Sequence, residues 1–336
     1  MRALPLTLIA ALLASLAGCD TSGSKAVTDT PGGDAAIDPA TLCVSNSCGT
    51  RLPLLDIGDA ENIQFSDSGR LFVSGGSNVY EITRSGQTFE SHALLDGSCN
   101  FTGLAIRANT LYANCFNGHL YAAPLGSSSA TQTKLVDIHS TGLASANGLS
   151  EGPDNTLYIV NGPLTDSARV VKLTLDAADP MKVTAQADWL TSGVQMPNGI
   201  QRRGNTLYIM NSSALAGEGT QILAVPIAPD GNAGPVEVRA ALFAIGDDFA
   251  LVGDHFLSVE FVTGGASLLK PDGTVAQSIT AGTFIGPSHI EVTRGPLFKP
   301  GQILVTEKGI LSEPDSPIGN TLTLFHPSSD PKPIPP

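Results

Sequence analysis

Short apolar segments alternate with polar turns along most of this chain. Residues 196–212 show the pattern: an Asn-Gly pair at 198–199 opens a short strand, a polar turn follows at 202–205, and strand-forming residues return at 206–209. β-Branched and aromatic residues in short runs between turn signals are typical of β-hairpins. The segment therefore predicts two antiparallel strands with a polar residue at the start of the first.

The same pattern occurs six times. The first polar residues of the units are Glu61, Thr102, Asn147, Asn198, Asp248 and Ser288, with steps of 41, 45, 51, 50 and 40 residues. Repeats of this length with several strands each are typical of β-propellers. The sequence therefore predicts an all-β fold over residues 50–327: a six-bladed β-propeller of four-stranded blades around a central channel.

One strand-like segment lies outside the six repeats. Residues 51–57, RLPLLDI, precede the first unit. We expect this segment to pair with the outer edge of the sixth blade, because an unpaired edge invites aggregation and ring closure removes it. The N-terminal strand is thus predicted to close the last blade.

The N-terminus has the features of a bacterial export signal. Arg2 precedes a short apolar run at 4–16, and Leu-Ala-Gly-Cys at 16–19 resembles the lipobox that directs lipidation. Residues 1–18 are predicted to be a lipoprotein signal peptide and Cys19 the lipidated first residue of the mature protein. An ordinary signal peptide with an incidental cysteine is the alternative.

The segments flanking the repeats differ from them in composition. Residues 20–42 lack aromatic residues and any apolar period, so 19–49 is predicted to be a lipidated, flexible tether. Residues 328–336 form a Pro-rich tail that we expect to be disordered. The predicted location is the bacterial cell envelope, with acyl chains on Cys19 in a membrane and the propeller in the periplasm or at the cell surface.

Four cysteines remain beside Cys19: Cys43, Cys48, Cys99 and Cys115. An even number in an exported chain indicates two disulfides, and four cysteines allow three pairings. We favour the two local pairs, the first with the second and the third with the fourth. A zinc site is the alternative, although a C-x₂-C spacing is absent from the sequence.

Charge and motifs exclude several function classes. The net charge is −13 with 18 basic residues, which argues against a nucleic-acid partner. The sequence has no G-x-S-x-G, H-E-x-x-H, P-loop or dinucleotide-binding motif. We expect a monomer whose partners are a small-molecule substrate and, through Cys19, a membrane.

The polar residues that start the six units are candidate site residues. The innermost strand of each propeller blade lines the central channel, so these residues are expected to form a ring at one end of it. Two carboxylates and two amides in such a ring suit Ca²⁺, with Mg²⁺ or Mn²⁺ as alternatives and Zn²⁺ less suited without His or Cys. The simpler interpretation is that Asn and Asp begin strands because they favour turns.

The repeats resemble the SMP-30/gluconolactonase/LRE-like (regucalcin-type) family of six-bladed propellers over roughly residues 50–327. The resemblance lies in the Asn-Gly-Leu/Ile and Leu-Tyr phrases and in the spacing of the ring residues. It implies that Glu61, Asn198 and Asp248 hold the metal ion. It also implies that Asn147 contacts substrate or metal-bound water.

The sequence departs from that family at two positions. The usual Glu-Gly-Pro of the first blade is Glu61-Asn62-Ile63 here, and Ser145 stands where the sugar lactonases have an Arg. In the fifth blade we prefer Asp248 to Asp247, because it lies nine positions before Leu257, as Asn198 lies nine positions before Leu207.

The leading functional hypothesis is metal-dependent hydrolysis of a small ester or lactone. The cation would polarise the carbonyl or activate water, Asp248 would act as base, and Asn147 would orient the substrate. Further substrate contacts are predicted for Thr102, Ser288 and His289, although a buried histidine is more often a packing residue. The alternatives are a lipid-anchored propeller that binds a glycan, peptide or envelope protein around a structural cation, and a strictosidine-synthase-like condensing enzyme.

Overall fold

The computed structural model describes residues 37–126, 133–165, 167–212, 219–242, 244–311 and 316–329. The predicted signal peptide, the lipidation site at Cys19, most of the tether and most of the tail lie outside these residues. A short 3₁₀ helix, η1 (Pro39–Thr41), precedes the first strand. Within the described ranges, no helix is long and apolar enough to cross a membrane.

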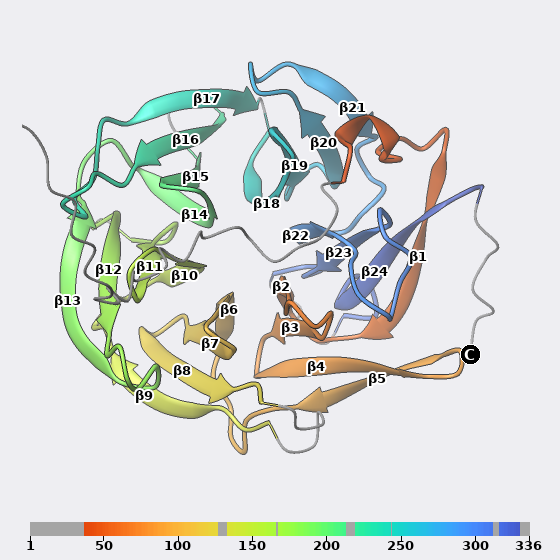
Figure 1. Cartoon of the computed structure of the whole chain (residues 1–336). Coiled ribbons are helices and arrows are strands. Elements are labelled where there is room, and N and C mark those ends of the chain that lie inside the picture. Colours follow the sequence, from red (N-terminus) through yellow and green to blue (C-terminus); the bar gives the residue numbers. More distant parts are fainter. Residues whose placement is uncertain are drawn as a thin grey trace, which may run out of the picture. The chain divides into compact units, whose positions relative to one another are not determined.

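The described chain forms six four-stranded antiparallel sheets in a ring (Figure 1). The first two blades are β2 (Ala60–Phe65), β3 (Leu71–Gly75), β4 (Asn78–Ser85) and β5 (Thr88–Ala93), then β6 (Phe101–Arg107), β7 (Thr110–Cys115), β8 (His119–Pro124) and β9 (Val136–Ser140). The next two are β10 (Ala146–Glu151), β11 (Thr156–Asn161), β12 (Arg169–Leu175) and β13 (Val183–Leu190), then β14 (Met196–Arg203), β15 (Thr206–Ser212), β16 (Thr220–Pro226) and β17 (Glu237–Leu242). The last two are β18 (Gly246–Val252), β19 (His255–Glu260), β20 (Gly265–Leu269) and β21 (Val275–Ile279), then β22 (Pro287–Val292), β23 (Ile303–Glu307), β24 (Thr321–Pro327) and β1 (Gly49–Asp56).

The N-terminal strand closes the ring, as predicted. Strand β1 pairs antiparallel with β24, so the sixth sheet has the order β1-β24-β23-β22. The inner strands β2 and β22 also contact each other, which joins the first blade to the last. The six-bladed propeller is therefore confirmed.

The position of a strand within its blade determines its burial. Middle strands such as β7, β11 and β23 are buried at every position, whereas the outer strand β5 is mostly exposed or half-buried. Sheets stacked face to face exclude water from both surfaces of their middle strands. Apolar side chains of neighbouring blades accordingly pack together, as Phe72 of blade one does with Phe101 and Leu104 of blade two.

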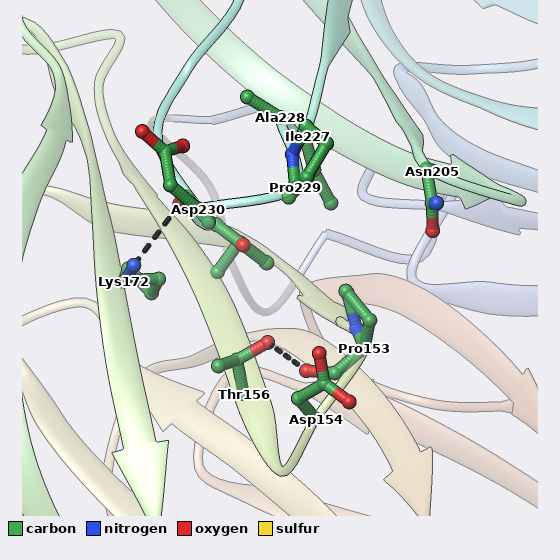
Figure 2. A pocket seen from close by; sticks show the side chains of 11 residues that line it. Pro153, Asp154, Thr156, Lys172, Asn205, Ile227, Ala228, Pro229 and Asp230 are labelled. Carbon is green, nitrogen blue, oxygen red and sulfur yellow. Dashed lines mark hydrogen bonds between the residues drawn. The ribbon is translucent and has the colours of Figure 1, made fainter. Parts of the chain in front are cut away.

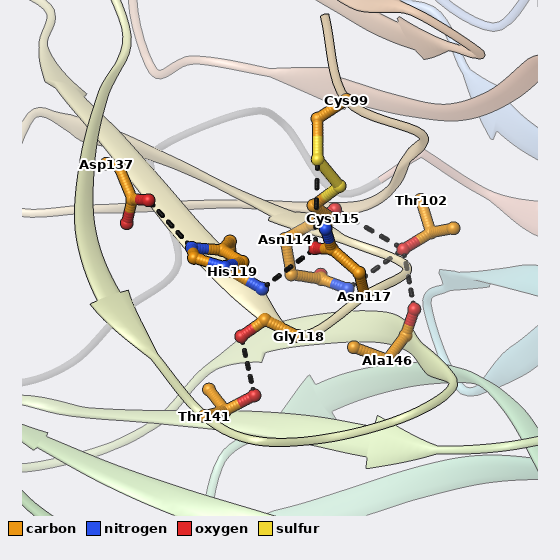
Figure 3. Close-up of a disulfide and its surroundings, with 10 residues drawn as sticks. All are labelled: Cys99, Thr102, Asn114, Cys115, Asn117, Gly118, His119, Asp137, Thr141 and Ala146. Atoms are coloured by element: carbon orange, nitrogen blue, oxygen red, sulfur yellow. Dashed lines mark hydrogen bonds and ion pairs between the residues drawn. A yellow bond between two sulfur atoms is a disulfide. The ribbon is translucent and has the colours of Figure 1, made fainter.

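Both predicted disulfides are present. Cys43 is bonded to Cys48 before β1, and Cys99 is bonded to Cys115 at the end of β7. Figure 3 shows the second bond beside Asn114 and Asn117 of the second blade. Local pairing was predictable because each pair lies within one repeat or one short loop.

Removing the Cys99–Cys115 bond by a double substitution to serine should lower the free energy of unfolding by about 3 kcal/mol, since it closes a loop with a sequence separation of 16 residues. Urea unfolding without reductant measures the change. The Cys43–Cys48 pair, with a separation of 5, is the internal control and should cost about 2 kcal/mol. A larger loss of stability for the Cys43–Cys48 pair than for the Cys99–Cys115 pair would show that loop closure does not explain the stabilisation.

Candidate active site

A break in the hydrogen-bond ladder recurs near the start of the inner strands. In β2, Glu61 and Asn62 lie opposite Ser74 alone, and the same two-against-one arrangement occurs in β6, β10, β14 and β18. Strand β22 has one extra residue, Ser288, at this place. Such bulges reorient side chains and are common beside functional sites. The structurally equivalent residues are Glu61, Thr102, Asn147, Asn198, Asp247 and Ser288.

The structure places Asp247, and not Asp248, at this position in blade five. The pairing of β18 with β19 makes Phe256 the counterpart of Leu207 in blade four, whereas the sequence comparison had matched Leu207 to Leu257. Both candidates are apolar strand residues, so hydrophobic pattern alone could not choose between them. The register of the hairpin corrects the prediction by one residue.

A cavity of about 420 Å³ lies at this end of the channel. The predicted residues Glu61, Thr102, Asn147 and Asn198 line it together. Three other predicted residues, Asp248, Ser288 and His289, are buried and are not among the residues that line the cavity. The polar lining adds Asp59, Asn100, Asp247 and Lys308, of which the sequence indicates only Asp247, as the alternative to Asp248.

Asp247 is the buried acid of the cavity. Its Oδ2 accepts a hydrogen bond of 2.7 Å from Ser288 Oγ, and the side-chain amide of Asn198 donates to its Oδ1. Burial, together with the charge of Glu61, holds the pKa of Asp247 well above its usual value. Ser288 thus positions this carboxyl group.

Lys308 supplies the positive charge of the cavity. It directly follows β23, and its ammonium is ion-paired with Glu61 Oε2 and lies 3.2 Å from Asp59 Oδ1. Burial alone would lower the pKa of Lys308, but the charges of Glu61 and Asp59 raise it above its usual value, so the side chain stays protonated. Sequence comparison missed this residue because it belongs to the end of a middle strand rather than to the start of an inner one.

The predicted divalent-cation site has the right kinds of ligand in an unsuitable arrangement. Carboxylate and amide oxygens are suitable Ca²⁺ ligands. However, the Lys308 ammonium is paired with Glu61, and the amide nitrogen of Asn198 faces Asp247. Among the described residues, no group of three His, Cys, Asp or Glu side chains is placed to hold a metal ion. As they lie, these residues do not fit a divalent cation.

A second cluster lies deeper in the channel. His289 Nδ1 is 2.8 Å from Asp248 Oδ2, and Asn62 Nδ2 donates to the same oxygen at 2.8 Å. Burial alone would lower the pKa of His289, but the Asp248 carboxylate raises it to about 10. The cluster is therefore a buried ion pair that holds three inner strands together. Neither His289 nor Asp248, for which substrate and metal contacts are predicted, lines the cavity.

Glycines at the equivalent positions of other blades allow the inner strands to approach each other closely. A Cβ atom on Gly199 would lie 2.0 Å from Asp248 Oδ1, and one on Gly148 would lie 2.4 Å from a backbone oxygen of the next strand. The inner strands are thus too close for side chains at these points. This explains the Asn-Gly pairs that were visible in the sequence.

The outer part of the cavity is apolar. Its wall, called the apolar wall here, consists of Phe116, Pro163, Leu164, Ile245, Phe261 and Leu311. Leu164 is 77% exposed and Leu311 is 66% exposed. Exposed leucines next to a charged floor indicate a ligand that has both a polar and an apolar part.

A smaller cavity of about 270 Å³ lies between blades three and four (Figure 2). Its lysine, Lys172, donates a hydrogen bond of 3.0 Å to the carbonyl oxygen of Gly231. The indole of Trp189 donates to the same oxygen at 3.0 Å. These bonds fix the turn of blade four against blade three, so we interpret this cavity as a joint between blades.

Comparison with known proteins identifies the fold. No protein-family model matches the chain, and no curated protein matches it. Among solved structures, a calcium-binding protein, regucalcin, from Agrobacterium tumefaciens strain C58 matches with a TM-score of 0.61 and 14% identity over 87% of this chain and 98% of that one. A luciferin-regenerating enzyme matches with a TM-score of 0.58 and 10% identity over 83% and 94% of the two chains.

A chain of a nidogen/laminin complex matches as well, with a TM-score of 0.51 and 16% identity over 70% of this chain and 84% of that one. The resemblance to the regucalcin-type family therefore holds for the fold. At these identities it does not extend to the activity, since one propeller fold carries many functions.

Proposed function

We propose that this protein hydrolyses small esters or lactones in the central cavity and that it is a distant relative of the SMP-30/gluconolactonase/LRE-like propellers. The observation that carries the proposal is the grouping of Asp247, Lys308 and the amides of Asn147 and Asn198 on the floor of one cavity. A general base, a positive charge and neutral hydrogen-bond donors can together catalyse acyl transfer to water.

The reaction can be written with these residues alone. The Asp247 carboxylate takes a proton from a water molecule as the water oxygen bonds to the carbonyl carbon. The Lys308 ammonium and the two amides stabilise the negative charge on the carbonyl oxygen. The bond from carbon to the leaving oxygen then breaks, and that oxygen receives the proton from Asp247. A lactone and water give a hydroxy acid.

The metal-dependent form of the hypothesis stays a prediction. In that form Glu61, Asn198 and Asp248 would hold a divalent cation, with Ca²⁺ preferred, that polarises the carbonyl. The present arrangement of Lys308 does not fit such an ion. No step above depends on it. Lipidation at Cys19, attachment to a membrane of the cell envelope and a monomeric state also stay predictions.

The apolar wall predicts a preference for substrates with an acyl or alkyl chain. In a series of lactones with lengthening chains, kcat/KM should rise by about fourfold per methylene while the added carbons contact the wall, because each buried methylene contributes about 0.8 kcal/mol. Steady-state hydrolysis by the full chain measures the series. Leu164→Ser should weaken the increase of kcat/KM with chain length and leave kcat/KM for the shortest lactone unchanged.

Val275→Ser is the matched control, since Val275 is an exposed apolar residue on the outer strand of blade five and does not line the cavity. It should leave the whole series unchanged. If the folded protein turns over none of the lactones or esters, the hydrolase proposal fails. The binding-protein alternative, with a glycan, peptide or envelope protein as ligand, would then be preferred.

A further inference from the structure

We infer that the ammonium of Lys308 takes the place of a divalent metal ion, so that the cavity works with a cation built into the chain. The inference rests on the proposed function for its chemical role, but its central claim concerns cation binding and is tested by binding. It changes the cofactor expected for this site from Ca²⁺ to none.

The position of Lys308 carries the first step. Its side chain is 14% exposed and lies between two acids near the start of the first blade: Asp59 in the turn before β2, and Glu61 within β2. The same cavity contains the buried Asp247 of blade five. Two carboxylates therefore pair with one ammonium and a third carboxyl group lies in the same cavity, where a cation would otherwise have to balance their charge.

A metal ion and the Lys308 ammonium would compete for the same space and the same negative charge. Any ion that used the Glu61 carboxylate would lie close to the Lys308 ammonium, and like charges a few ångströms apart repel strongly where water is scarce. An incoming Ca²⁺ would have to displace the lysine from its partners. A cavity built this way excludes the metal.

The ammonium group of a lysine can also stabilise the negative charge that forms on the substrate. The group presents three N–H donors on a flexible stem, so it can donate to a carbonyl oxygen and stabilise the oxyanion that forms there without leaving its carboxylates. It donates hydrogen bonds only, and the proton that moves in the reaction is the one that Asp247 takes and returns. Lys308 thereby supplies the positive charge that a metal ion would supply.

The test is Ca²⁺ binding to the full chain, measured by titration calorimetry without any substrate. The wild-type protein should show no saturable binding in the cavity. Lys308→Met removes the charge and keeps much of the side-chain volume. It should gain saturable Ca²⁺ binding, on the order of a hundredfold tighter than any residual binding by the wild-type protein. Lys308→Arg keeps the charge and should bind no better than wild type, and circular dichroism shows whether each variant is folded.

Lys134→Met is the matched control, because Lys134 forms an exposed ion pair with Asp96 at 2.7 Å and should not create a site when replaced. Tight binding of Ca²⁺ by the wild-type protein would overturn the inference, since the lysine would then give way to the metal. Failure of folded Lys308→Met to bind would also overturn it. A missing hydrolase activity would refute the proposed function and leave the binding results intact.

Discussion

Replacing Asp247 by asparagine should lower kcat/KM for lactone hydrolysis by about a thousandfold. Asparagine has nearly the same size as aspartate, and its amide oxygen can still accept a hydrogen bond from Ser288. In the wild-type protein, Ser288 Oγ donates this bond to Asp247 Oδ2 at 2.7 Å. It removes the group that would take the proton from water, and loss of a general base typically costs 10²- to 10⁴-fold. Steady-state kinetics on the short-chain lactone measures the loss.

Asp254→Asn is the matched control for this experiment. Asp254 lies in the turn between the first two strands of the same blade, and its side chain is 70% exposed. The control should hydrolyse the lactone at the wild-type rate. If Asp247→Asn were folded and retained more than about a tenth of the activity, another residue would have to be the base, and the mechanism proposed above would be wrong.

Residues that each repeat encodes locally could be predicted from sequence. Glu61, Asn147 and Asn198 were found because each begins an inner strand, and the propeller places such residues around one channel. The two disulfides could be predicted because each joins cysteines within one repeat or one short loop. Asp247 was missed by one residue because the choice depended on hairpin register, which the two adjacent aspartates and two adjacent apolar residues left open.

Residues brought together by closure of the ring could not be predicted in this way. Asn62 and Asp248 are 186 residues apart in sequence and bond to each other directly. Lys308 reaches Glu61 across 247 residues, between the last blade and the first. Each residue alone looks like an ordinary polar residue of a strand or its end, and only the closed ring brings each pair into contact.

The second large effect is expected for the buried pair of Asp248 and His289. Asp248→Ala should lower the free energy of unfolding by about 3–5 kcal/mol, because it leaves the charge of His289 buried without its partner. Both side chains are largely buried, with exposed fractions of 8% and 1%. Chemical denaturation near pH 6.5 measures the change. Asp137→Ala breaks the exposed pair with His119 and should cost under about 1 kcal/mol.

The pH dependence distinguishes this ion pair from simple packing. The pKa of His289 is raised from 6.5 to about 10 in the folded protein, so its contribution is fully present below about pH 6.5 and is lost as the pH rises towards 10. Two carboxylates face the ring: Asp248, and Glu291 with its Oε2 3.9 Å from Nε2. Burial would raise the pKa of Glu291, but His289 and Arg294 lower it, so this group stays charged through the same range. The difference in stability between wild type and Asp248→Ala should therefore shrink between pH 6.5 and 10. A difference that stayed constant would show that Asp248 contributes by packing alone and that its ion pair with His289 adds no stability.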